Sequence, residues 1–217
     1  MRTNANRLLA GLGIALGLAA CNKNEQSAFP LDVGYQPLEA CEASLPAATA
    51  TDPTPEALGA PVMGTRDGHD YAHGRAYVKA SLAEVWAALQ DPMTSHIHGP
   101  QVEVLPGDEP FPLSFQIKYT ESTIIGLVQW TIVYRGGTTP ATGTPESAGL
   151  RYQKIWGTHF INVQSGSLAA VPAEGASDVT EVSFVCWLDA TGQDPSNAWG
   201  TVTDWFNDLV AKVHAPP

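Results

Sequence analysis

Four histidines stand in two short spacings that could bring imidazole rings together. The first spacing is His69-Asp70-x-x-His73 and the second is His96-x-His98. Imidazole nitrogens and carboxylate oxygens are ligands that zinc and related metals prefer. The first pair precedes a predicted strand and the second follows a predicted helix, so the topology does not require the pairs to meet. We therefore interpret these histidines as solvated loop residues, and we expect neither a metal nor a cofactor.

His159 is the strongest candidate for a polar group inside a binding cavity. It lies in a strand predicted over residues 159–168 and shares its parity with Ile161 and Val163, which should face the interior. A neutral imidazole there could hydrogen-bond a carbonyl or hydroxyl group of a ligand, or transfer a proton. The alternative is a histidine whose ring bonds a neighbour or lies at a solvated strand end.

Common catalytic motifs are missing from the sequence. We find no G-x-S-x-G, no H-E-x-x-H, no phosphate-binding loop and no dinucleotide fingerprint. Asp204 and Asp208 lie one turn apart on the polar face of a predicted C-terminal helix, and we interpret them as solvated carboxylates. We therefore assign no catalytic residue.

The N-terminal segment has the parts of a bacterial export signal. Arg2 and Arg7 precede an uncharged apolar run at residues 8–20, which is too short to span a bilayer comfortably and ends in Leu18-Ala19-Ala20-Cys21. This ending resembles the lipobox of bacterial lipoproteins. The resemblance implies cleavage before Cys21 and lipidation of Cys21, which would anchor the protein to a membrane of the bacterial cell envelope. Asn22 at the next position favours the outer membrane over the inner, and the alternative is an ordinary secretory peptide with an incidental cysteine.

Cys41 and Cys186 are the two remaining cysteines. An oxidising envelope compartment would permit a disulfide between them. Cys186, however, shares strand parity with Phe184 and Leu188, which points its side chain toward the interior. A buried free thiol therefore stands beside the disulfide as an open alternative.

The rest of the chain divides into a linker and a domain. Residues 21–65 show no sustained periodicity and are rich in Ala, Pro and Thr, so we expect a tether between the lipid and the domain. The domain spans residues 66–217. Its pattern predicts a strand at 74–80, a helix that starts with the capping box Ser81-x-x-Glu84, six further strands between 102 and 188, and a helix of about 20 residues from Pro195.

Alternation in the strands and helical spacing at the C-terminus select the residues that should face inward. We expect these residues to line an apolar cavity, while ordinary core packing is the alternative. The set is Phe115, Ile117, Tyr119, Trp130, Ile132, Tyr134, His159 and Ile161 from the strands, and Trp205 and Phe206 from the helix.

The order of elements resembles that of the helix-grip family, also called START-like, Bet v 1-like or SRPBCC. The resemblance rests on residues 78–91 (VKASLAEVWAALQD), residues 165–168 (SGSL), the strand at 179–188 and the terminal helix. It implies an α+β fold in which a curved antiparallel sheet of about seven strands wraps around the long C-terminal helix. It also implies a hydrophobic cavity between sheet and helix that takes a lipid or another apolar small molecule.

Three functions remain open for such a domain. The first, which we favour, is a membrane-anchored module that binds an apolar small molecule or lipid without catalysis. The second is a cyclase-like or aromatase-like enzyme that uses a cavity His or Tyr for acid–base chemistry. The third is a domain with a filled core that docks onto envelope proteins, whose identity the sequence does not indicate.

The charge balance narrows the choice of partners. The chain carries 11 Lys and Arg against 22 Asp and Glu, a net charge of -11. Binding to nucleic-acid phosphates needs clustered basic side chains, so we expect no nucleic-acid partner. Removal of residues 1–20 would take away two arginines and no acid, leaving 9 basic and 22 acidic residues. Attraction to anionic lipids therefore does not help such a protein, and the lipid on Cys21 would have to hold it at the membrane.

Overall fold

An antiparallel sheet forms most of the structure. The computed structural model describes residues 24–29, 56–107, 111–124 and 126–216. Within these ranges nine strands form one sheet in the order β2-β3-β9-β8-β7-β6-β5-β4, and β1 pairs with the end of β7. The strands are β1 (Asn24–Gln26), β2 (Val62–Arg66), β3 (His69–Val78), β4 (Gln101–Pro106), β5 (Leu113–Thr123), β6 (Gly126–Thr139), β7 (Ser147–Thr158), β8 (Ile161–Pro172) and β9 (Thr180–Ala190).

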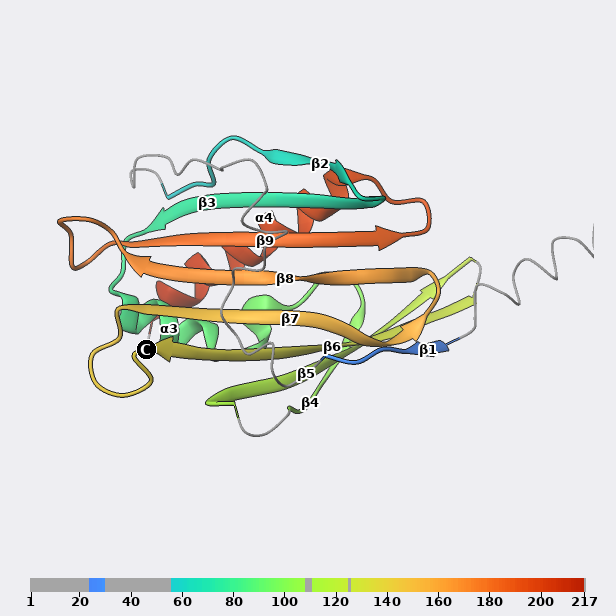
Figure 1. Cartoon of the computed structure of the whole chain (residues 1–217), viewed down its shortest axis with the longest axis horizontal. Helices are drawn as coiled ribbons and strands as arrows, with labels where there is room; N and C mark the ends of the chain where they lie inside the picture. The colour runs from blue at the N-terminus through green and yellow to red at the C-terminus, as the bar shows by residue number, and fades with distance from the viewer. Residues whose placement is uncertain (1–23, 30–55, 108–110, 125, 217) are drawn as a thin grey trace, which may run out of the picture.

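Helices cover one face of this sheet, which we call the inner face; the opposite side is the outer face. The described helices are α3 (Leu82–Leu89), the 3-10 helix η2 (Pro92–Ser95) and α4 (Pro195–Val213). The curved sheet wraps around α4, which crosses behind β3 and β9 in Figure 1. This is the helix-grip fold of class α+β that the sequence predicted. In the described part of the chain, no helix combines the length and the apolar character that a membrane span requires.

Two strands were not predicted, and both come from the N-terminal side of the expected domain boundary. β1 pairs with β7 through Asn24 and Thr158, and β2 pairs with β3 from Val62 to Arg66. Both strands are short and largely exposed, so they carry no hydrophobic alternation for a sequence pattern to detect. The sheet therefore extends into residues 21–65, where we expected a tether alone.

Helix α4 begins where its sequence predicts. Asp194 caps its N-terminus by accepting a hydrogen bond from the Ser196 amide, and Pro195 occupies the first turn. Its buried residues Val202, Trp205 and Leu209 recur at steps of three and four and face the sheet. Gly74 of β3 makes room for the helix, because a Cβ atom at this position would lie 2.7 Å from Cγ1 of Val202.

Helices α3 and η2 close one end of the inner face. The predicted capping box is present: the Glu84 amide donates to Ser81 Oγ, and the Ser81 amide donates to the Glu84 carboxylate. Asp91 then caps η2 by accepting from the Met93 amide, with Pro92 at the start of that helix. The chain leaves η2 at His96, close to α4.

Candidate functional site

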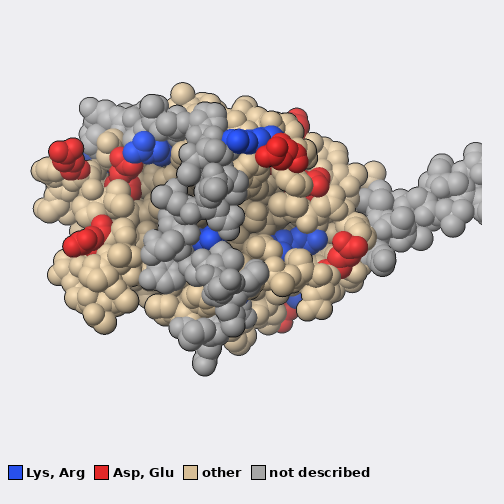
Figure 2. All heavy atoms as spheres, viewed as in Figure 1, with Lys and Arg blue, Asp and Glu red and all other residues tan. Residues whose placement is uncertain are grey.

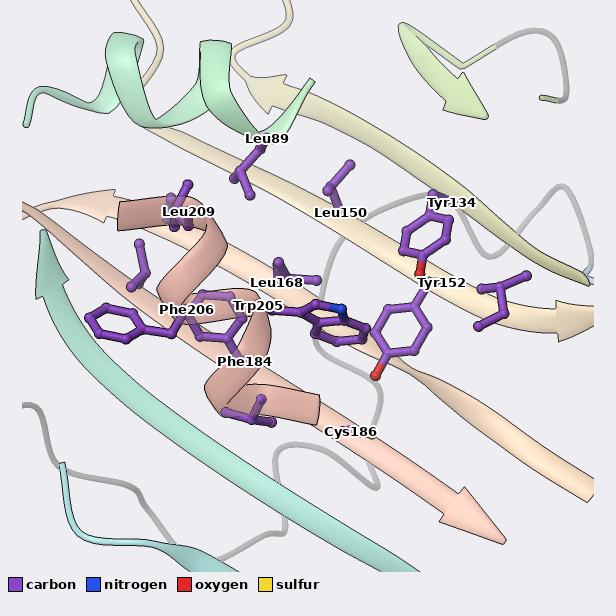
Figure 3. Packing of buried hydrophobic residues seen from close by; sticks show 14 of the residues in the cluster. Leu89, Tyr134, Leu150, Tyr152, Leu168, Phe184, Cys186, Trp205, Phe206 and Leu209 are labelled. Atoms are coloured by element: carbon purple, nitrogen blue, oxygen red, sulfur yellow. The ribbon is translucent and has the colours of Figure 1, made fainter. Parts of the chain in front are cut away.

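Nine of the ten residues expected to line a cavity belong to the hydrophobic core on the inner face, and each of the nine is at most 8% exposed. Their rings contact one another directly: Phe115 stacks on Tyr134 with centroids 4.8 Å apart, and Tyr119 stacks on Trp130 at 4.9 Å. Trp205 of α4 points toward the sheet beside Tyr152, which it meets edge-on at 4.9 Å (Figure 3). Side chains therefore fill the middle of the inner face.

A chain of hydrogen bonds joins this aromatic core to the segment after η2. The Ile97 amide donates to the Tyr119 hydroxyl, and the Tyr134 hydroxyl donates to the Ser95 carbonyl. The two hydroxyl oxygens are 3.5 Å apart, so Tyr119 is left to donate its proton to Tyr134. Burial raises the pKa of both hydroxyls well above the usual tyrosine value. They therefore stay protonated near neutral pH and serve as structural hydrogen-bonding groups rather than bases.

His159 does not lie on the inner face. It sits in the turn between β7 and β8, where its Nε2 is 3.0 Å from the Glu25 carboxylate of β1. The expected parity with Ile161 and Val163 fails for two reasons. The strand starts only at Ile161, and a register shift between Ile161 and Val163 turns Val163 toward the outer face. The alternative of a histidine bonded to a neighbour describes this residue.

Other polar side chains also lie on the inner face, and we call three of them, Trp130, Lys154 and Gln164, the inner polar cluster. They lie on the adjacent strands β6, β7 and β8, and they are 3%, 8% and 3% exposed. Lys154 shares parity with the core residues Leu150 and Tyr152, and Gln164 is paired with Leu188 of the core. Trp130 Nε1 and Gln164 Oε1 are buried without a hydrogen-bond partner among the residues that the structure describes.

The amine of Lys154 is held by backbone carbonyl groups. Its Nζ donates to the carbonyl oxygens of Thr158 and Ile161, which flank the turn after β7. Among the described residues no carboxylate lies within ion-pair distance of this Nζ, although Glu25 is near enough to oppose part of the shift. Burial lowers the pKa of Lys154, because the charged form loses its hydration. The cluster thus offers a charged donor, a neutral donor and a neutral acceptor in an apolar setting.

His96, His98 and Asp208 form a second group, which we call the histidine–aspartate cluster. His98 Nε2 lies 2.8 Å from Asp208 Oδ2, and His96 Nδ1 lies 3.5 Å from the same oxygen. One potential ligand atom from each residue lies within 4.8 Å of the others. Both histidines were candidates in the sequence analysis, whereas Asp208 was interpreted as a solvated carboxylate. No local sequence pattern links His98 to Asp208, because they are 110 positions apart.

The other histidines and cysteines of interest lie elsewhere. His69 and His73 are on β3, where His69 Nδ1 is 3.7 Å from Asp189 Oδ2 and His73 Nε2 is 3.1 Å from Ser183 Oγ. Cys186 is a free thiol that is buried completely on the inner face. Its pairing with Cys41 stays a prediction. Cys21 and Cys41 lie outside the described residues.

The outer face carries a shallow pocket of about 200 Å³. Phe29, Gln153, Ser165 and Trp187 line it together with Arg151, whose pKa burial lowers. Trp187 Nε1 is buried there with no partner in the described part of the chain. Figure 2 views this face and shows blue Lys and Arg side chains interspersed with red Asp and Glu. The pocket combines an aromatic wall with polar atoms but is smaller than most ligand sites.

Comparison with known proteins returns similarity in fold only. No family model and no curated protein matches the chain. The structure is similar to the ZhuI aromatase/cyclase of Streptomyces sp. R1128, with 11% identity, a TM-score of 0.48, and coverage of 67% of this chain and 93% of that one. It is similar to the lipid transfer and protein localization domain of human StarD13, with 13% identity, a TM-score of 0.49, and coverage of 98% and 96%. A STAR-related lipid transfer protein of Xanthomonas axonopodis gives 12% identity, a TM-score of 0.46, and coverage of 73% and 96%.

Proposed function

We propose that this protein is a membrane-anchored envelope lipoprotein whose helix-grip domain binds an apolar small molecule with an oxygen-bearing end, such as a fatty acid or hydroxylated lipid. The observation that carries the proposal is the inner polar cluster. Buried polar atoms in folded proteins are nearly always hydrogen-bonded, and each one left without a partner costs about 1–3 kcal/mol. Trp130 Nε1 and Gln164 Oε1, which have no partner in the described part of the chain, lie on the face that α4 covers.

The chemistry of the cluster specifies the end of the ligand. Trp130 Nε1 can only donate a hydrogen bond, and Gln164 Oε1 can only accept one. A hydroxyl or a protonated carboxyl group both donates and accepts, so it can bond to either atom. A carboxylate would instead gain from the nearby amine of Lys154. The apolar part of the ligand would lie along Ile132 and Ile161, which neighbour Lys154 on the inner face.

The anchor in this proposal is a lipid on Cys21. β1 begins at Asn24, three residues after Cys21, and it is bonded to β7. Three residues span at most about 11 Å, so the lipid would hold this end of the sheet against the membrane. A protein anchored in that position could exchange its ligand with the bilayer while it stays attached to the membrane.

Native mass spectrometry of the protein purified from membranes, with extraction of bound lipids, tests ligand binding. We expect the wild-type protein to retain a molecule that carries a carboxyl or hydroxyl group. Gln164→Leu should lower its affinity by about tenfold or more, because the ligand's donor would then be buried unpaired. The same substitution should leave the free energy of unfolding unchanged or raise it, since it removes an unpartnered buried amide oxygen.

His159→Ala is the matched control. His159 lies in the turn beside the cluster but faces Glu25, so its removal should leave ligand affinity unchanged. A wild-type protein that is free of any bound molecule, and that takes up neither fatty acids nor hydroxylated lipids, would refute the proposal.

A further inference from the structure

The histidine–aspartate cluster has the ligand set of a metal site. It offers two imidazoles and one carboxylate from two separate elements, the segment after η2 and helix α4. Two histidines and a carboxylate are a common ligand set for zinc and other divalent transition metals. Ligands that are each about 2.0–2.2 Å from one zinc ion are at most about 4 Å apart from one another. The observed limit of 4.8 Å is therefore wider than in an occupied site, and metal binding would draw the ligands together, with the His98 side chain, which is 47% exposed, free of close packing.

A backbone carbonyl fixes the orientation of the His96 ring. Its Nδ1 lies 2.7 Å from the Met93 carbonyl oxygen, which can only accept, so Nδ1 carries the proton. This arrangement leaves the lone pair on Nε2. Metal-bound histidines almost always donate their other ring nitrogen to a carbonyl or carboxylate in this way. The Met93 carbonyl thus acts as an orienting group for His96.

The aromatic core fixes the backbone that carries both histidines. Trp205 Nε1 donates to the His96 carbonyl at 3.0 Å, and Trp205 is one turn before Asp208 on α4. On either side of His96, the tyrosine chain bonds the Ser95 carbonyl and the Ile97 amide. Three buried side chains therefore hold the segment, and the ligands do not depend on a loose loop.

The surrounding charges favour a cation. Lys212, the nearest basic residue on α4, is paired with Asp91 at 2.6 Å, so it does not neutralise Asp208. The cluster itself then carries the single negative charge of Asp208 when both histidines are neutral. Its exposure is intermediate, with 20% of the His96 side chain and 22% of the Asp208 side chain accessible, so an ion from solution can reach it.

We propose that His96, His98 and Asp208 bind one divalent transition metal ion, with zinc as the expected ion. Two imidazole nitrogens and one carboxylate group would be the protein ligands, and water would complete the coordination. The ion would join α4 to the segment after η2, the two elements that close over the tyrosines of the inner face. Metal binding would therefore stabilise the packing of α4 against the segment after η2.

Calorimetric titration of the full mature protein with zinc chloride tests the site, together with thermal unfolding in the presence and absence of zinc. We expect one saturable zinc ion per chain and a rise in Tm when zinc is added. Asp208→Asn and His98→Ala should each weaken zinc binding by about tenfold or more and abolish the rise in Tm. Titration with cobalt(II) should give the visible absorption of a four-coordinate or five-coordinate ion in the wild type alone.

Two control variants separate this site from general affinity for zinc. Asp204→Asn removes the carboxylate one turn earlier on α4, and His159→Gln removes a histidine that faces a carboxylate without a second imidazole. Both should bind zinc as the wild type does. Circular dichroism of the metal-free variants establishes that each is folded before titration. A wild-type protein with no saturable zinc binding, or equal binding by Asp208→Asn and His98→Ala, would overturn the assignment.

Discussion

Cys186 lies at the centre of the inner face, paired with Ala72 of β3 and Gly166 of β8, and none of its surface is exposed. Burial raises its pKa to about 12, because the thiolate would lose its hydration there. We therefore predict that iodoacetamide does not alkylate Cys186 at pH 8 in a folded Cys21→Ser, Cys41→Ser variant, in which it is the only thiol. Intact-mass spectrometry measures the modification.

The same variant in denaturant is the control for this prediction. Unfolding exposes the thiol and returns its pKa to the ordinary range, so alkylation should then go to completion. Full modification under native conditions would show that the inner face opens far enough to admit a reagent. It would also favour the predicted disulfide with Cys41 over the buried free thiol.

Residues that follow simple alternation were predictable, and those that depend on long-range contacts were not. Phe115, Ile117 and Tyr119 face the core as their spacing requires. His159 was misplaced because a turn and a register shift interrupt the alternation that its position was inferred from. The alternation that Lys154 shares with Leu150 and Tyr152 indicates that its side chain faces the core. This signal was missed, because a lysine in a strand is ordinarily expected to face solvent. The partnership of Asp208 with the histidines becomes visible only once α4 is docked.

At the scale of elements, the contact between β3 and α4 depends on one glycine. A Cβ atom at Gly74 would lie 2.7 Å from Val202 Cγ1 and 3.0 Å from Leu58 Cδ2, so the helix would have to shift. We predict that Gly74→Ala lowers the free energy of unfolding by about 1–3 kcal/mol through overpacking. Denaturant titration followed by tryptophan fluorescence measures the change.

Gly200 of α4 provides the matched comparison. No atom lies within 4 Å of a Cβ placed there, so Gly200→Ala should stabilise the protein by up to about 1 kcal/mol through helix propensity. Equal effects of the two substitutions would contradict the close approach of α4 to β3.

The elements differ in how far their own sequences determine them. Capping residues and amphipathic spacing were sufficient to predict α3 and α4, because these signals are local. The seven other strands, β3 to β9, were predicted from hydrophobic alternation and turn residues. β1 and β2 could not be predicted, because their stability comes from pairing with β7 and β3 and not from buried side chains of their own.

At the scale of the whole molecule, β1 fixes which end of the domain would meet a membrane. β1 and β6 flank the same end of β7 and both run antiparallel to it, so they run in the same direction. The N-terminus of β1, which leads back toward Cys21, therefore lies at the same end of the sheet as the β5–β6 hairpin (Figure 1). Ile124 and Leu127 of this hairpin are 105% and 48% exposed. With the lipid proposed on Cys21 beside it, this apolar hairpin would be suited to insertion into a bilayer interface.

We predict that this end contacts the bilayer when the protein is anchored through Cys21. A spin label attached in a Cys41→Ser, Ile124→Cys variant, lipidated and bound to vesicles, should be reached by dissolved oxygen and shielded from a water-soluble nickel chelate. Val171 is 40% exposed and lies at the C-terminal end of β8, far from the β5–β6 hairpin. A label in a Cys41→Ser, Val171→Cys variant should therefore show the reverse accessibility. Buried Cys186 does not compete for the label. Equal accessibility at the two positions would mean that residues 21–23 allow the domain to reorient freely, and the hairpin would then have no role at the membrane.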